Sequence, residues 1–320
     1  MSAADGPKRR ARGESPSDAP CVVCSAPMRP TRASSGGTIL YVCDRCGHGT
    51  LLPRPSAADL EAAYAEAYGE EGAKFHAPFE RLLALGARQE ARELAALLPP
   101  TCRRALDVGC GRGVLLQALR KLGVDAEGVE RSAQAAAGGH GARVHIAAEL
   151  RDARLPGAAY GLVVFRHVLE HLDDPLEALR EARRLLVAGG SLVVEVPDRA
   201  SLQARAFTSA WFHLDIPRHL HHFSGASLTR ALDACGFDVV SVGPGAVVQD
   251  VMGWLQSALH RLGRPHQGLY QGLHRGQRPQ ARDVLLGASL LPAVVCATAW
   301  ERATGSAAAV RAIARPRPDA

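Results

Sequence analysis

The feature that most constrains this chain is a short apolar strand that runs into a glycine-rich loop and then a helix, RALDVGCGRGVLLQAL, from Arg104 to Leu119. Gly109, Gly111 and Gly113 lie in the loop. Glycine has no Cβ, so the backbone can turn sharply there and a ligand can approach it closely. The pattern predicts a ligand site at the end of a strand, but a glycine-rich turn alone does not identify the ligand.

Apolar strands and amphipathic helices alternate after this loop. Strands are expected over 105–108, 125–130, 142–146, 161–165 and 191–196, and helices over 114–122 and 175–186. This alternation is typical of βαβ units, in which a parallel sheet carries helices on both faces. Residues 237–242 and 308–314 are expected to form closing strands, with an unusually long segment between them. The fold class is therefore α/β.

The composition fits a soluble globular chain, with 47% hydrophobic and 22% charged residues. The net charge of +6 tolerates an acidic partner without requiring one. No secretory signal is visible, and cytoplasm is the expected location. The predicted division is a disordered tail (1–20), a zinc ribbon (21–50), a helical linker and cap (51–100), a core (101–248), a helical insertion (249–303), and a closing strand with a tail (304–320).

Two carboxylates narrow the choice of ligand. Asp107 precedes the GxGxG loop, and a carboxylate there would repel a pyrophosphate but suits the amino group and sulfonium of S-adenosylmethionine (SAM). Glu130 ends the next expected strand, where it could accept both ribose hydroxyls of a nucleoside. An acidic residue at that place also fits NAD, so Glu130 supports a nucleoside, while Asp107 favours SAM.

From Ala105 to Asp198 the chain resembles the class I SAM-dependent methyltransferases, the broad group that includes the ubiquinone-pathway O-methyltransferases. The resemblance lies in ALDVGCGRG, in HVLEHLDDP (His167 to Pro175) and in LLVAGGSLVVEVPD (Leu185 to Asp198). WFHLDIPRHLHHFS (Trp211 to Ser224) also looks like the region before the sixth strand of that family. The resemblance implies a Rossmann-like sheet of seven strands, the last of them antiparallel.

The resemblance also implies residue roles. The resemblance places Asp107, Gly109, Cys110 and Gly111 at the methionine part of the cofactor and Glu130 at its ribose. It places Glu149 and Leu150 at the adenine, and His167 beside the cofactor at the end of the fourth strand. The chain departs from the family pattern at Gly161, where an Asp is usual, and at Ala188, where a Pro is usual.

Methyl transfer is an in-line displacement that depends mostly on alignment, and a base is needed only if the acceptor keeps its proton. Histidines suit that task at neutral pH. His167, His171 and His219 are the catalytic candidates, and His221 and His222 fall at the same expected edge of the sheet. The predicted acceptor is a small molecule (a sugar, a quinone-like compound or another secondary metabolite). The alternatives are an RNA or protein methyltransferase, and a non-catalytic SAM-binding regulatory module.

Four cysteines near the N-terminus form two CxxC pairs, Cys21 with Cys24 and Cys43 with Cys46. Their spacing predicts a zinc ribbon, in which four thiolates make a closed structural Zn²⁺ site. A ribbon this small cannot bury a core, so metal would stabilise it. It carries few basic or aromatic side chains, which argues against nucleic acid as a partner and favours a docking or lid role.

The long insertion has an unusual order of residue types. Its first part, 260–282, is rich in arginine and histidine with no acid, and the following stretch, 284–300, has no charge. A buried helix pair that covers the sheet is the favoured interpretation. The alternative is peripheral membrane contact through 260–300, which would suit a lipid-linked acceptor. The oligomeric state is not predicted.

Overall fold

The computed structural model describes residues 19–68, 76–136, 141–273 and 279–318. The predicted tail therefore lies outside the described residues, apart from its last two. A seven-stranded sheet forms the centre, and its strands follow in space the order β10 (Phe237–Pro244), β11 (Ala309–Pro316), β8 (Leu186–Pro197), β7 (Tyr160–Arg166), β4 (Arg104–Val108), β5 (Asp125–Glu130) and β6 (Val144–Ile146).

The direction of the strands confirms the predicted Rossmann-like sheet. Strands β6, β5, β4, β7 and β8 pair in parallel, whereas β11 runs antiparallel to both β8 and β10. The carboxyl ends of the five parallel strands therefore meet at one edge, where the glycine loop and Glu130 lie. Ligands of such sheets bind at this edge.

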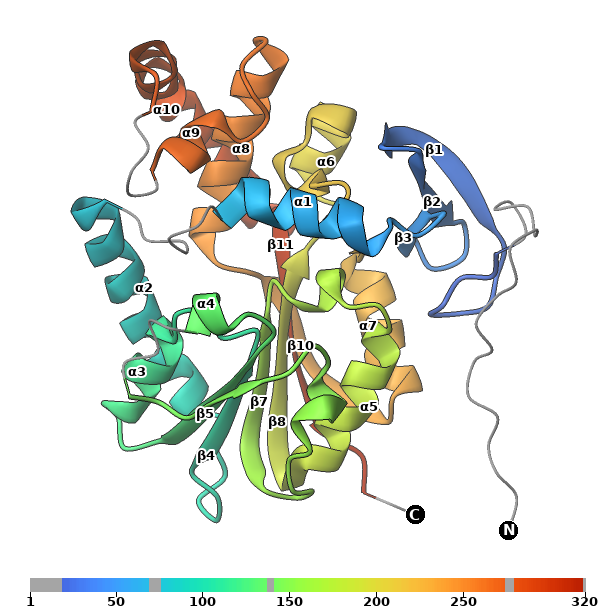
Figure 1. The fold of residues 1–320 in the computed structure, drawn as a ribbon, viewed down its shortest axis with the longest axis vertical. Helices are drawn as coiled ribbons and strands as arrows, with labels where there is room; N and C mark the ends of the chain where they lie inside the picture. Colours follow the sequence, from blue (N-terminus) through green and yellow to red (C-terminus); the bar gives the residue numbers. More distant parts are fainter. Residues whose placement is uncertain (1–18, 69–75, 137–140, 274–278, 319–320) are drawn as a thin grey trace.

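Helices cover both faces of the sheet (Figure 1). On one face, α2 (Ala77–Ala95) and α3 (Val114–Arg120) bury leucines and alanines against β4 and β7. On the other, α5 (Pro175–Leu185) and α7 (Gly225–Ala234) share a core with Phe165 and Phe237. Local signals begin the last two helices: the Asp174 carboxylate accepts the Glu177 N–H before α5, and Ser224 makes a capping box with Ser227.

The N-terminal strands build a second, antiparallel sheet that also includes part of the core. β1 (Met28–Ser35), β2 (Thr38–Cys43) and β3 (Gly49–Leu52) are followed in this sheet by β9 (His221–His222). The short strand β9 pairs with β3, and the Leu51 N–H donates to the Leu220 carbonyl at 3.0 Å. The predicted ribbon and the core therefore share a sheet.

Several shorter elements link the strands of the two sheets. Helix α1 (Ala57–Tyr68) crosses above the carboxyl edge (Figure 1), and α6 (Leu202–Phe207) packs against α8 (Val247–Arg261) of the insertion. Helix α4 (Ala133–Ala136) follows β5. The described residues also form 3₁₀ turns at Leu150–Ala153, Leu169–His171, Thr208–Ala210 and Phe212–Leu214.

The helical insertion corrects one expectation. Helices α8 (Val247–Arg261) and α10 (Ala281–Ala303) do pack together, around Leu255, Leu259 and Val294, with α9 (Gly268–Gly272) between their ends. They stand beyond the carboxyl edge and do not cover the sheet (Figure 1). Only 22% of the most apolar stretch of α10 is buried, so the prediction of a buried helix pair was wrong for α10. By length and composition alone, α10 is the one described helix that could cross a membrane.

Candidate active site

The glycine loop after β4 has the backbone geometry that its sequence predicts. Gly109 and Gly111 have φ angles of +70° and +50°, which favour glycine. A Cβ on Gly109 would lie 2.2 Å from Cγ2 of Val168, so a larger residue cannot occupy that position without displacing the neighbouring loop. A Cβ on Gly111 would meet no described atom within 4 Å, so this part of the loop borders open space.

Asp107, at the carboxyl end of β4, is a buried carboxylate that lacks a full set of partners. Its side chain is 2% exposed, and Oδ2 has no hydrogen-bond partner among the described residues. Burial raises the pKa of Asp107 to about 7, although the nearby Arg166 guanidinium acts to lower it. A buried carboxylate is costly without a partner, so this group fits a cationic ligand such as the ammonium or sulfonium of SAM.

Glu130 closes β5 beside the same loop. Its Oε2 accepts the N–H of Gly111 at 2.9 Å, and its Oε1 accepts the N–H of Ser132 at 3.1 Å. These two bonds fix the carboxylate on the loop, while each oxygen keeps a second lone pair. The placement is compatible with the expected bonds to ribose hydroxyls.

The other expected cofactor residues differ in their surroundings. Glu149 is half-buried, and burial raises its pKa, with Asp173 adding to the effect. The Leu150 side chain belongs to the buried core, so only its backbone could face an adenine. The Cys110 side chain is also buried, and a Cβ on Gly128 would lie 2.4 Å from its sulfur. Cys110 therefore packs the loop onto β5.

His167 lies between two carboxylates. Its Nε2 is 3.2 Å from Glu195 Oε1, and its Nδ1 is 3.5 Å from Glu170 Oε1. Burial opposes a charge on this ring, but the hydrogen bonds to Glu170 and Glu195 outweigh burial and raise the pKa of His167 to about 9. With both nitrogens engaged, His167 is suited to orienting its neighbours rather than to accepting a proton.

His171 and His219 lie edge to face, with ring centroids 4.7 Å apart. The Nδ1 of His171 is 2.9 Å from the Arg218 carbonyl, and the Nδ1 of His219 is 2.9 Å from the His213 carbonyl. A carbonyl only accepts, so Nδ1 carries the proton in both rings and each Nε2 keeps a lone pair. Burial, followed by the nearby His171, holds the pKa of His219 well below its usual range.

Glu170 completes a group with these two histidines. Its carboxylate is 1% exposed, and its Oε1 lies 3.5 Å from His167 Nδ1 and 4.0 Å from His219 Nε2. One ligand atom from each of Glu170, His171 and His219 lies within 4.8 Å of the others. By its donor types, the group could hold a divalent cation or accept a proton from a bound hydroxyl.

Three residues at this edge were absent from the sequence-based site. Glu195, at the end of β8, pairs with His167 and with Arg311, whose Nε is 2.7 Å from Oε2. Tyr64 of α1 brings its hydroxyl within 3.2 Å of His171 Nδ1, and Asp215 lies 3.6 Å from His219 Nε2. A carboxylate inside the apolar run SLVVEV was a signal for Glu195, whereas no local pattern marks Tyr64.

His221 and His222, expected at the same edge, belong to the contact with the ribbon. The Nδ1 of His221 is 3.1 Å from Nε2 of His48, and its Nε2 is 2.8 Å from an Arg54 nitrogen. Arg54 also donates to the Asp173 carbonyl at 2.9 Å. Burial is the main cause that lowers the pKa of His222 to about 3. These neutral histidines join the two sheets.

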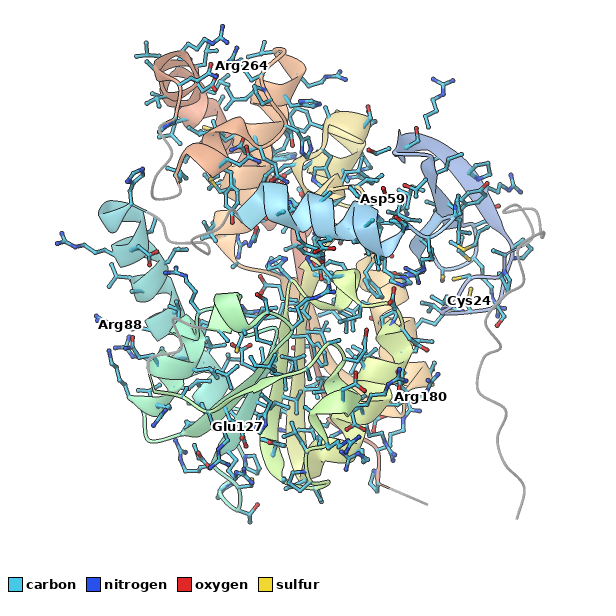
Figure 2. The ribbon with its side chains drawn as sticks, viewed as in Figure 1. Cys24, Asp59, Arg88, Glu127, Arg180 and Arg264 are labelled. Atoms are coloured by element: carbon cyan, nitrogen blue, oxygen red, sulfur yellow. The ribbon has the colours of Figure 1, made fainter. Side chains whose placement is uncertain are left out.

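The four cysteines of the ribbon converge, as their spacing predicts (Figure 2, near Cys24). The sulfurs of Cys21 and Cys46 are 3.5 Å apart and those of Cys24 and Cys43 are 3.4 Å apart, and all four lie within 4.8 Å of one another. Thiolates around a tetrahedral zinc ion are about 3.8 Å apart, so the donor set fits Zn²⁺.

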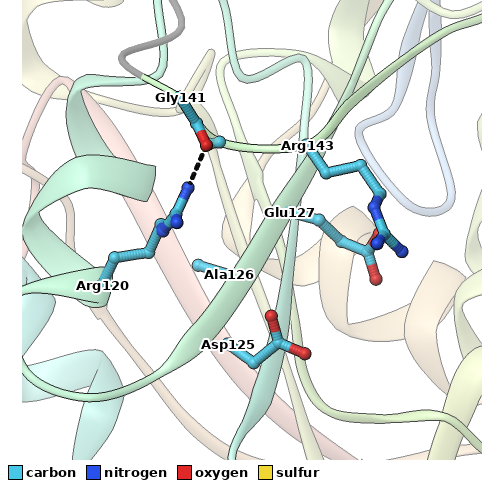
Figure 3. Close-up of a pocket in the computed structure, with 7 residues that line it drawn as sticks. Arg120, Asp125, Ala126, Glu127, Gly141 and Arg143 are labelled. Atoms are coloured by element: carbon cyan, nitrogen blue, oxygen red, sulfur yellow. Dashed lines mark hydrogen bonds and ion pairs between the residues drawn. The ribbon is translucent and has the colours of Figure 1, made fainter.

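A polar pocket of about 410 Å³ lies at the opposite edge of the sheet (Figure 3). It borders the first residues of β5, where Arg120 donates to the Gly141 carbonyl and Arg143 lies near Glu127. The Glu127 carboxylate also accepts from the Tyr160 hydroxyl at 2.8 Å. Because Glu130 marks the other end of β5, this pocket is separate from the glycine loop.

The departure from the family pattern at Gly161 has a steric reason. A Cβ there would lie 2.2 Å from the Cys102 carbonyl oxygen and 2.9 Å from Pro99 Cδ. The chain that enters β4 therefore packs directly on β7, and an aspartate would not fit. Ala188 lies in the irregular first part of β8, where the pairing with β7 shifts register and Gly189 has a φ of +75°.

Comparison with known proteins agrees with this geometry. The family model described as a methyltransferase domain matches residues 75–242. A ubiquinone biosynthesis O-methyltransferase of Cereibacter sphaeroides is 30% identical over 142 residues, which are 42% of this chain and 58% of that protein. One of Methylococcus capsulatus is 32% identical over 163 residues, 44% of this chain and 68% of that protein.

Among solved structures, a SAM-dependent methyltransferase from Archaeoglobus fulgidus aligns with a TM-score of 0.48 at 18% identity, over 80% of this chain and 100% of that one. The chain spans little more than half of the Cereibacter relative. The match to the methyltransferase domain, in contrast, covers more than half of the chain and includes the glycine loop, Glu130 and the histidine edge. The chain therefore belongs to the methyltransferase domain family.

Proposed function

We propose that this protein is a SAM-dependent methyltransferase that acts on a hydroxyl group of a small molecule. The observation that carries the proposal is the buried Asp107 carboxylate, whose free oxygen lies beside the open glycine loop and Glu130. The relatives named as ubiquinone biosynthesis O-methyltransferases support oxygen as the acceptor atom and a small hydroxylated compound as the acceptor.

The residues of the loop would hold the cofactor in a fixed orientation. Asp107 would pair with its cationic methionine part, the backbone of Gly109 and Gly111 would allow close approach, and Glu130 would accept ribose hydroxyls. When bound, SAM supplies a methyl group already activated by the positive sulfur. The protein therefore contributes mainly alignment and the exclusion of water.

The histidine edge would receive the acceptor. Nε2 of His171 or His219 would take the proton of the acceptor hydroxyl, with Glu170 stabilising the imidazolium that forms. His167, held between Glu170 and Glu195, would keep this carboxylate in position. A neutral His219 at pH 7 is compatible with the role of a base.

We also propose that the four cysteines bind one structural Zn²⁺. Four sulfur ligands leave no position for a substrate, so the metal would stabilise the ribbon and take no part in the reaction. The ribbon contacts the core through β9, directly after His219, which supports a role in shaping the acceptor side. An RNA or protein acceptor is not favoured, because the ribbon carries few basic residues.

The binding half of the proposal is tested by titrating S-adenosylhomocysteine into the purified protein by calorimetry. Asp107→Ala removes the buried carboxylate that we propose pairs with the ammonium, and we expect at least a tenfold loss of affinity. The matched control is Asp125→Ala, at the opposite end of the neighbouring strand and largely exposed. Equal affinities for the two variants would contradict the assignment of the loop.

The catalytic half is tested by following S-adenosylhomocysteine release with a panel of phenols, catechols, sugars and polyprenylated phenols. We expect turnover with at least one hydroxylated compound. Release with RNA or a protein mixture, and with none of the small molecules, would replace the proposed acceptor class by the alternative.

A further inference from the structure

The outward side of α10 is an exposed apolar surface. Large apolar side chains on this helix point away from α8, and their exposed fractions reach 71% at Leu285, 66% at Trp300 and 55% at Val295. We call this surface the outer face of α10; its members are Val284, Leu285, Leu286, Leu291, Val295 and Trp300. Several large apolar side chains exposed on one helix are typical of an interaction site.

The outer face extends around more than half of the helix. Successive residues advance by about 100°. Val284, Leu285 and Leu286 are all exposed, whereas the buried positions follow one narrow stripe through Gly287 and Val294. A second helix would cover one stripe of such a cylinder. A broad apolar arc is instead typical of a helix embedded in a fluid apolar medium.

The exposed charged side chains of α8 and α10 are basic. Helices α8 and α10 contain three acids, Asp250, Asp283 and Glu301, and all three are buried. Asp283 pairs with Arg264 and Asp250 with Arg302. The arginines at the junction of the two helices, Arg261 and Arg282, are exposed. The surface therefore offers positive charge beside apolar side chains (Figure 2, near Arg264).

Both ends of α10 are held by the folded chain. Near its start, the Asp283 carboxylate pairs with Arg264. Near its end, Glu301 accepts from Gln203 Nε2 at 2.9 Å and from Trp254 Nε1 at 2.8 Å. The helix, which is about 34 Å long, is thus fixed near both of its ends. This attachment suits a helix that lies in a membrane interface better than one that crosses the bilayer.

We propose that the outer face of α10 binds the surface of an anionic lipid bilayer, with Leu285, Val295 and Trp300 inserted among the acyl chains and Arg261 and Arg282 near the lipid phosphates. Apolar burial and attraction to anionic lipids together determine the binding of such helices. The basic residues make the binding sensitive to salt.

The helical insertion also contacts the acceptor side of the site. The Phe212 N–H donates to Ser257 Oγ of α8 at 2.9 Å, and Gln267 Nε2 donates to Asp215 Oδ1 at 3.0 Å. Asp215 is the residue that faces His219. An acceptor dissolved in the bilayer would therefore enter the site from the adjoining surface. This consequence rests on the proposed function, whereas lipid binding itself does not.

The test is flotation of the purified full-length protein with two kinds of vesicle, phosphatidylcholine alone and phosphatidylcholine with about a third phosphatidylglycerol. We expect the protein to float with the anionic vesicles, and expect at least a fivefold smaller floating fraction with neutral vesicles or in 0.5 M salt (estimated from screening). Leu285→Asp with Val295→Asp should abolish flotation.

The matched control is Leu82→Asp with Val240→Asp, an exposed leucine and an exposed valine on α2 and β10, which should float like the parent. Unchanged binding of S-adenosylhomocysteine by both double variants would show that the fold is intact. The proposal is overturned if the parent stays unbound with both vesicles, or if the α10 double variant floats equally well. It is also overturned if sedimentation shows a dimer that the α10 substitutions dissociate.

Discussion

His167 connects three parts of the site through one ring. It lies directly after β7, reaches Glu195 on β8 with one nitrogen and faces Glu170 of the following turn with the other. Its φ of +53° is unusual for a residue with a Cβ. A residue in such a backbone position persists only where its surroundings hold it, and the two carboxylates provide that hold.

The charge on His167 predicts a pH dependence of stability. Its pKa in the folded protein is about 9, above the value of about 6.5 in an unfolded chain. The contribution of the charged His167 ring to the free energy of unfolding is therefore fully present below pH 6.5 and is lost as pH rises through 9. We expect the free energy of unfolding of the parent, relative to His167→Gln, to fall by about 3 kcal/mol between pH 6.5 and 9.5.

Urea unfolding of the two proteins across that range measures this difference. Comparing parent and variant cancels the contributions of the other titrating groups, provided that those groups are unaffected by the substitution. Two curves that stay parallel would show that His167 is not charged in the folded protein.

His219 predicts a separate effect on turnover. Its Nε2 keeps a lone pair near Glu170, so His219→Gln should lower kcat by about a hundredfold if this nitrogen is the base. Affinity for S-adenosylhomocysteine should change less than threefold, because the residues proposed to hold the cofactor are those of the glycine loop and Glu130 (an estimate from binding arithmetic). His145→Gln is the control, since His145 pairs with Glu127 at the opposite edge.

The assay is S-adenosylhomocysteine release with the best acceptor from the panel. His171→Gln is measured in parallel with His219→Gln, because both rings belong to the group formed with Glu170. If neither variant slows turnover, proton removal by this pair is not part of the reaction.

At the scale of elements, the second sheet joins the ribbon to the acceptor side. Strand β3 follows the cysteines closely and pairs with β9, so loss of metal from the ribbon should loosen a segment of the core. We expect a chelator to release about one zinc ion per chain and to speed amide exchange over 21–52 and also over 219–223.

Hydrogen exchange followed by mass spectrometry, with and without the chelator, measures both segments. Exchange in β4 and β5 is the internal control, since these strands lie in the other sheet and should not change. Faster exchange in the ribbon alone would show that β9 is held by the core and not by β3.

For the whole molecule, the parts with a regular pattern were predictable. The alternating strands and helices and the GxGxG loop predict a parallel sheet and the place of its ligand edge, because period and turn chemistry are local properties. The convergence of Cys21, Cys24, Cys43 and Cys46 was predictable for the same reason, since their spacing alone constrains it.

What could not be predicted depends on contacts between distant segments. The strand β9 has only two residues and therefore no periodicity, so its pairing with β3 could not be predicted from the sequence. The partnership of Glu195 with Arg311 joins residues 116 apart. An apolar helix such as α10 has the same composition whether it packs in a core or faces outward, so its exposure appeared only in the structure.

The shared sheet also bears on how the chain is made. Gly49 pairs with His222, so β3 leaves the ribosome about 170 residues before its partner strand exists. During that interval the first three strands have an open edge and almost no core of their own. An early metal ion would close the cysteine pairs and keep that edge in register until β9 arrives. Zinc supply during synthesis, rather than in the finished enzyme, is therefore where we expect a shortage to reduce the yield of folded protein.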